Sequence, residues 1–137
     1  MVYEIELAIF GASVGIATPI SVYLAKKLIE PVFGLRELIG EIAYSMNYYA
    51  NIYSNPGMSP NHQKVSTILR QLASKLVSKL YLVKYPSVPA TFGLTPSIQD
   101  TVTASRELIG ISNMLFSAQN VQAIYKSSEE IKKRLRI

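Results

Sequence analysis

The sequence of 137 residues has no cysteine, no tryptophan and one histidine, His62. Without cysteine there is no disulfide framework, no thiolate nucleophile and no cysteine metal site. A single histidine rules out a multi-histidine metal site. Glycine-rich phosphate loops, nucleophile elbows and Glu-x-x-His pairs are missing as well. These absences predict a protein that is not an enzyme and needs no cofactor.

Charge is absent from one long apolar stretch, the 19 residues from Leu7 to Ala25. As an α-helix this stretch would be roughly 28 Å long, close to the hydrocarbon thickness of a bilayer. Its N-terminal flank is acidic, whereas a cleaved signal peptide begins with basic residues. A buried helix of a soluble domain would be the other alternative, but this one is unusually long for a small domain. The sequence therefore predicts a transmembrane anchor in residues 1–30.

Basic residues are missing from the first 25 positions, and all 14 lysines and arginines follow. Seven of the nine acids also follow, which gives the segment 26–137 a net charge of +7. Lys26 and Lys27 stand directly after the apolar stretch. The positive-inside rule then places the N-terminus outside and the domain of residues 31–137 in the cytoplasm, so we expect a single-pass protein of the inner membrane. The cations are dispersed, which argues against nucleic acid as a partner.

The predicted anchor contains one small-residue motif, Gly11-x-x-x-Gly15. Such a motif lets a second helix approach closely, and it predicts a homodimer or a membrane-protein partner held through the transmembrane helix. The alternative explanation is that glycine is simply common in membrane helices.

The rest of the chain predicts helices, because apolar residues recur at helical spacing over 35–53, about 61–83, 98–116 and 121–135. Pro31 and Gly34 predict a break where the anchor ends, and the breaker-rich segments 54–61 and 85–97 predict loops. The expected fold is all-α, with one N-terminal transmembrane helix followed by a small three- or four-helix bundle. Gly40 and Gly110 each end a copy of Arg-Glu-Leu-Ile-Gly in mid-helix, and we expect them at close helix contacts.

Four tyrosines form the first candidate site, at helical spacing: Tyr44, Tyr48, Tyr49 and Tyr53. They could line a pocket for a small ligand or a partner peptide. They could equally be core and boundary residues, with the ring buried and the hydroxyl at the rim.

The uncharged segment 85–97 is the second candidate site, a membrane contact formed by Val88, Phe92 and Leu94 with Lys84 beside them. Apolar residues at this density in an exposed loop usually face a partner surface, and lysines are attracted to anionic headgroups. In the alternative explanation, Phe92 and Leu94 cap the open end of the bundle.

The stretches IGEIAYSMNYYANIYSNPG (39–57) and RELIGISNMLF (106–116) resemble segments of uncharacterised prokaryotic single-pass membrane proteins with a short helical domain. The resemblance implies no reaction, cofactor or catalytic residue. We expect a membrane-anchored, non-enzymatic interaction module that binds a protein partner or the inner leaflet, with the lipid bilayer itself as a partner. The alternative is a small-ligand sensor or carrier with a tyrosine-lined helical pocket.

Overall fold

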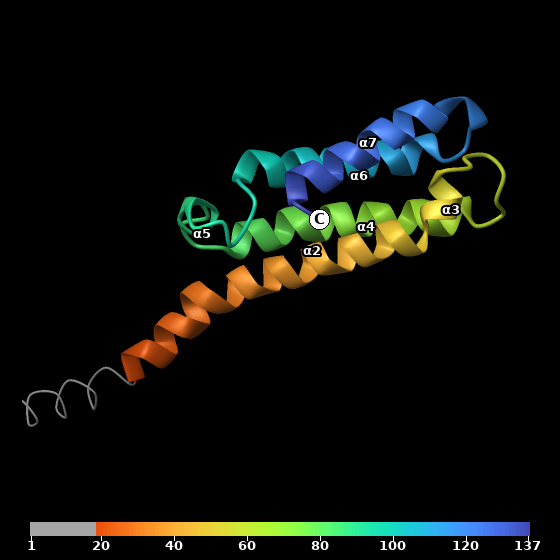
Figure 1. The fold of residues 1–137 in the computed structure, drawn as a ribbon. Coiled ribbons are helices and arrows are strands. Elements are labelled where there is room, and N and C mark those ends of the chain that lie inside the picture. Colours follow the sequence, from red (N-terminus) through yellow and green to blue (C-terminus); the bar gives the residue numbers. More distant parts are fainter. Residues whose placement is uncertain (1–18) are drawn as a thin grey trace, which may run out of the picture.

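The computed structural model describes residues 19–137, which form helices joined by turns and contain no strand. The all-α prediction is confirmed for this part of the chain. Figure 1 shows four long helices lying side by side: α2 (Glu30–Tyr48), α4 (His62–Leu82), α6 (Ile98–Met114) and α7 (Val121–Leu135). Three short elements join them: α3 (Ala50–Tyr53), α5 (Ser87–Thr91) and the 3₁₀ turn η2 (Ala118–Asn120).

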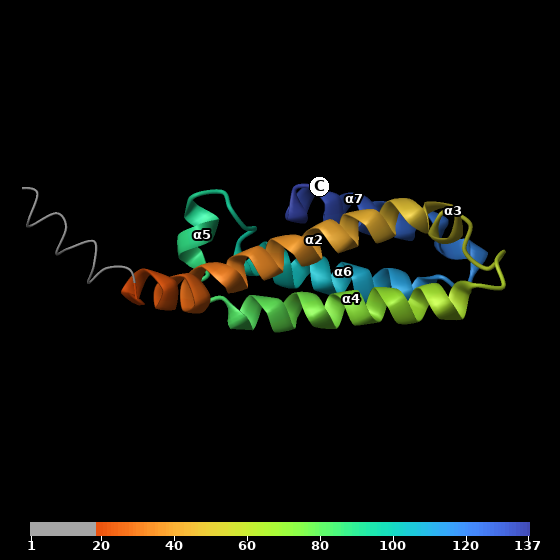
Figure 2. The same ribbon diagram turned by 90° about the horizontal axis from the view of Figure 1, so that it is seen from below.

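Each long helix runs antiparallel to the one before it, as in an up-and-down four-helix bundle (Figures 1 and 2). The helix α6 packs extensively on both α4 and α7, while α2 packs on α4 and, less extensively, on α7. The core consists of side chains that repeat at helical spacing on the inner faces, including Leu35, Ile42, Met46, Val65, Leu69, Leu72, Leu76, Leu108, Ile111, Ile124 and Ile131.

Small polar side chains hold α4 and α6 together. Ser66 donates its hydroxyl to the carbonyl oxygen of Ser112 at 2.9 Å, and Ser105 donates to the carbonyl oxygen of Ala73 at 3.0 Å. All four residues are buried, and the two contacts lie seven residues apart on each helix. Because these side chains are small, the two backbones come close enough for hydroxyl-to-carbonyl bonds.

The two mid-helix glycines do not have the role that the sequence predicts. A Cβ atom at Gly40 would meet no heavy atom of the described residues within 4 Å, and one at Gly110 would meet only Met114 of its own helix, at 3.9 Å. The predicted close helix contacts at Gly40 and Gly110 are therefore wrong within the described bundle. Each glycine costs its helix roughly 1 kcal/mol relative to alanine.

The chain enters the bundle as one continuous helix. Residues 19–24 are α-helical, the next turn, η1 (Ala25–Ile29), is a π-helix, and α2 follows without a gap. The predicted break at Pro31 is wrong, because the helix continues through Pro31 directly after the π-helical turn, and such local adjustments accompany prolines inside helices. Gly34 does not end the helix either and lies within α2, with the Lys79 side chain beside it.

Within residues 19–137, no helix combines the length and the apolar composition needed to cross a membrane. Of the predicted span from Leu7 to Ala25, residues 7–18 lie outside the described residues, and so do Gly11 and Gly15.

Two further boundaries differ from the prediction. The helix expected over 35–53 is interrupted at Tyr49, whose backbone (φ −97°, ψ 13°) leaves the helical conformation and separates α2 from α3. The segment 85–97, expected as a loop, contains the short helix α5. By contrast, the ends of α4, α6 and α7 lie within two residues of the expected ones.

A polar contact ties the start of α6 to the end of α7. Ser97 caps α6 by accepting the backbone N–H of Asp100 at 3.0 Å, and Arg134 bonds both Asp100 (2.7 Å) and Glu130 (2.6 Å). The hydrogen bond from Arg134 lowers the pKa of the Asp100 carboxyl below its usual 3.8. Because the folded pKa is the lower one, this contact stabilises the fold above pH 3.8 and is lost as the pH falls through the folded value.

A substitution at the contact between α4 and α6 tests how closely the two helices pack there. Ser105→Leu should lower the free energy of unfolding by at least about 2 kcal/mol, because the larger side chain has no room and the hydroxyl bond is lost. Ser105→Ala, the matched control, removes only the bond and should cost about 1 kcal/mol. Denaturant unfolding followed by circular dichroism measures both values. Equal losses in the two variants would show that the contact has spare room.

Candidate membrane-contact site

An apolar groove of about 240 Å³ lies where the N-terminal end of α2 meets α5. One wall comes from η1 and the first turns of α2, and the other from the turn after α4 and from α5. The apolar lining residues are Leu28, Ile29, Val32, Phe33, Tyr85, Val88, Pro89, Phe92 and Leu94. The structure thus brings the predicted membrane-contact residues together with side chains from η1 and α2 that the sequence analysis did not single out.

The larger side chains of this groove are mostly exposed to water. Phe92 is 76% exposed, Phe33 60%, Val88 54% and Leu94 49%. The buried residues of segment 83–96 are instead Val83, Pro89, Thr95 and Pro96. The explanation that Phe92 and Leu94 cap the bundle therefore does not fit the structure.

Basic side chains surround the groove. Arg36 and Lys84 line it, and the exposed Lys26 and Lys27 lie at most two residues before its first lining residue. The Lys84 ammonium lies 5.7 Å from the centroid of the Tyr85 ring, which is cation–π range. An apolar groove with a rim of cations matches the interface of an anionic bilayer, which offers phosphates outside and hydrocarbon inside.

Tyr85 holds an unusual backbone conformation at the turn between α4 and α5. Its φ is +57°, in the left-handed region that a bulky residue rarely adopts, and its side chain is 63% exposed. This conformation costs roughly 1–2 kcal/mol, and little burial of the ring offsets that cost. Strain of this kind tends to occur at functional positions, and Tyr85 lies in the wall of the groove.

The four tyrosines of the other candidate site point to different faces. Tyr44 and Tyr48 are each 64% exposed and stack with ring centroids 5.6 Å apart. Tyr49 is half-buried and meets Tyr48 edge to face. Tyr53 is buried, donates its hydroxyl to the carbonyl oxygen of Met46, and has a pKa that burial raises. The interruption at Tyr49 separates them, and no cavity of the described residues gathers all four.

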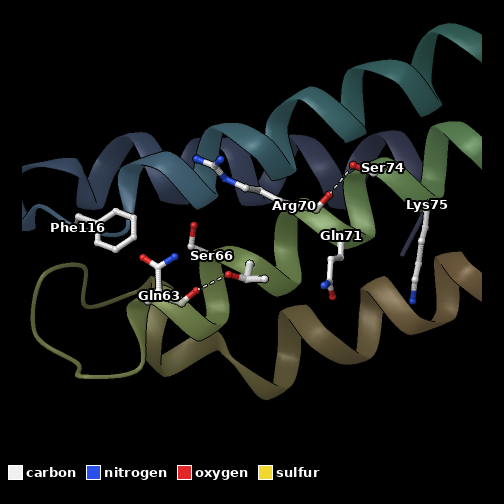
Figure 3. A pocket seen from close by; sticks show the side chains of 8 residues that line it. Gln63, Ser66, Arg70, Gln71, Ser74, Lys75 and Phe116 are labelled. Carbon is white, nitrogen blue, oxygen red and sulfur yellow. Dashed lines mark hydrogen bonds between the residues drawn. The ribbon is translucent and has the colours of Figure 1, made fainter.

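A second hollow, of about 700 Å³, was not expected from the sequence. Figure 3 shows it along the outer side of α4, between α6 and α2, with Phe116 at one end. Most of its polar groups already have partners. Thr67 and Ser74 bond carbonyls of their own helix, and Arg70 bonds Ser112 and Asn113. The sequence feature that could have pointed to this hollow is the charge of residues 62–82, which carry four cations and no acid.

No protein-family model matches this sequence, and no curated protein and no solved structure is significantly similar to it. The resemblance to uncharacterised single-pass membrane proteins stays a prediction, and the functional argument rests on the geometry of the bundle alone.

Replacing Tyr85 by glycine tests the strain at the groove wall. Tyr85→Gly should raise the free energy of unfolding by up to about 1 kcal/mol, because glycine adopts a positive φ without steric cost. The matched control is Tyr81→Gly in α4, where an exposed tyrosine has ordinary helical geometry and glycine should cost about 1 kcal/mol. Thermal unfolding followed by circular dichroism compares the two, and equal losses would contradict the assignment of strain.

Proposed function

We propose that this protein is a membrane-anchored, non-enzymatic interaction module whose groove-bearing end rests on the anionic inner leaflet. The observation that carries the proposal is the exposed apolar groove between α2 and α5, with its rim of cations, at the end of the bundle where the N-terminal segment enters. The groove thus lies beside the segment predicted to be the anchor.

The energies are sufficient for such a contact. Fully moving a side chain such as Phe92 or Leu94 out of water contributes roughly 1.5–3 kcal/mol, and each nearby lysine or arginine adds about 1 kcal/mol on an anionic surface. A chain anchored in the same membrane also holds the groove at a high effective concentration near the lipid. A few partly inserted side chains are then enough to keep the bundle in place.

The alternative of a small-ligand sensor requires a pocket that the tyrosines share. Because Tyr44 and Tyr48 face outward while Tyr53 is buried beside α7, the described structure offers no such pocket, and we do not propose this function.

The proposed topology can be tested on the full chain, which has no cysteine of its own. Tyr125→Cys places a single thiol on α7 at a side chain that is 63% exposed. In bacterial spheroplasts, a membrane-impermeant maleimide should label it only after the membrane is opened, because the domain lies in the cytoplasm. Labelling of intact spheroplasts would overturn this orientation.

Docking on lipid can be measured with a nitroxide at Val88→Cys in the full chain, reconstituted in vesicles that contain anionic lipid. We expect position 88 to collide more with lipid-soluble oxygen than with a water-soluble nickel complex, because the side chain enters the interface. The control label at Tyr125→Cys lies near the start of α7, which Figure 1 places at the end of the bundle away from α5, and should show the reverse. Raising the salt concentration should weaken the effect, since charges contribute.

A second variant separates docking from folding. Phe92→Ser should leave the unfolding temperature nearly unchanged, because the ring is 76% exposed, and it should reduce the oxygen signal at position 88. Docking would be contradicted if, at low salt and with Phe92 unchanged, the labels at positions 88 and 125 were equally exposed to water.

A further inference from the structure

The helix α2 has an outer face whose residues are exposed, although residues 93–96 and 135–137 lie beside it near Gly40, and α5 lies across the groove from Phe33. Figure 2 shows α2 in front of α6 and α7. Along it, residues at spacings of three and four form one stripe, all of them exposed: Phe33, Glu37, Gly40, Tyr44 and Tyr48. The three aromatic side chains are each at least 60% exposed. We call these five residues the outer stripe.

Gly40 lies at the middle of the outer stripe, opposite the side of α2 that Leu38 and Ile42 bury. A side chain at this position would meet open space, so nothing within the described bundle requires glycine. What glycine adds here is a bare patch of backbone between Phe33 and Tyr44, where the backbone of another helix can approach closely. The need for glycine therefore points outside the bundle.

Two charges on the flanks of the outer stripe can pair with a second copy of this chain, whereas Glu37 within the stripe would face Glu37 of that copy. Arg36 flanks the stripe on one side and Glu41 flanks it on the other, five residues further along the chain. In two parallel helices packed face to face, residues with this spacing on opposite flanks meet across the contact. Among the described residues Arg36 has no acid within 4 Å, and Glu41 has only a contact of 3.6 Å with Lys75, in which both side chains are about half exposed.

We propose that the outer stripe of α2 binds a second copy of this chain, with the two α2 helices parallel and crossing at Gly40. A two-fold axis through the crossing would pair each Arg36 with Glu41 of the other copy, so both ion pairs form at once. The parallel direction rests on the proposed function, because two chains anchored in one membrane by the same end must run the same way.

Single cysteines test this pairing in the full chain in lipid nanodiscs, without background thiols. Glu37→Cys, Gly40→Cys and Tyr44→Cys should each form disulfide-linked dimers with their own kind, because equivalent residues of parallel helices face each other. Exposed positions on other helices, Gln71→Cys and Tyr125→Cys, serve as controls and should not cross-link. Failure at all three stripe positions, or equal cross-linking of the controls, would overturn the proposal.

Cross-linking at position 40 alone would show antiparallel helices, which meet only at their crossing point. That result would overturn the parallel pairing and would count against entry of both chains into one membrane. Lipid docking of α5 is read separately by the nitroxide at position 88, so failure of the dimer and failure of the proposed function are distinguishable.

Substitution of Gly40 separates association from folding. Gly40→Leu should raise the unfolding temperature, because leucine favours helix and has open space here, yet it should weaken dimer cross-linking at position 37 by about tenfold or more. Gly110→Ala is the matched control, which should raise the unfolding temperature and leave cross-linking unchanged. If Gly40→Leu left cross-linking intact, the crossing at Gly40 would be wrong.

Discussion

The close packing of α4 on α6 is the contact on which the rest of the bundle depends. Two buried serine-to-carbonyl bonds, Ser66 to Ser112 and Ser105 to Ala73, fix how far the helices slide along each other as well as how close they lie. Once this antiparallel pair is set, α7 packs on the open side of α6 and α2 on that of α4. The leucine-rich inner face of α4 is then buried from both sides.

The helix α2 lies on the outside of this arrangement, and its surface is unusual because it carries exposed aromatic side chains. Its inner face contributes Leu35, Ile42 and Met46 to the core, while its outer face carries exposed aromatic side chains along nearly its whole length. The N-terminal end of α2 also forms one wall of the apolar groove. The side chains that pack in the core and the exposed aromatic side chains therefore lie on opposite faces of one helix, so substitutions on the outer face can leave the core unchanged.

Periodicity in the sequence predicts the helices whose buried face repeats along one segment. It does not predict which of several distant segments fills a given place in the core. The helices α4, α6 and α7 were predictable because their inner faces repeat every three to four residues. The exposure of Phe92 and the burial of Thr95 were not, because both depend on how the short segment after α4 folds back on the bundle. The exposure of Gly40, by contrast, could have been predicted. The buried residues Leu35, Leu38 and Ile42 place Gly40 on the opposite, outer side of α2.

The continuous helix from residue 19 to residue 48 makes the entrance to the bundle a mechanical lever. A helix of this length is about 45 Å long and is stiff against bending. A tilt or rotation applied at residue 19 is carried into the core-facing side of α2 instead of being absorbed by a linker. The π-helical turn at Ala25–Ile29 interrupts the regular α-helical geometry of this lever without breaking it. A displacement at residue 19 would thereby change how α2 packs on α4.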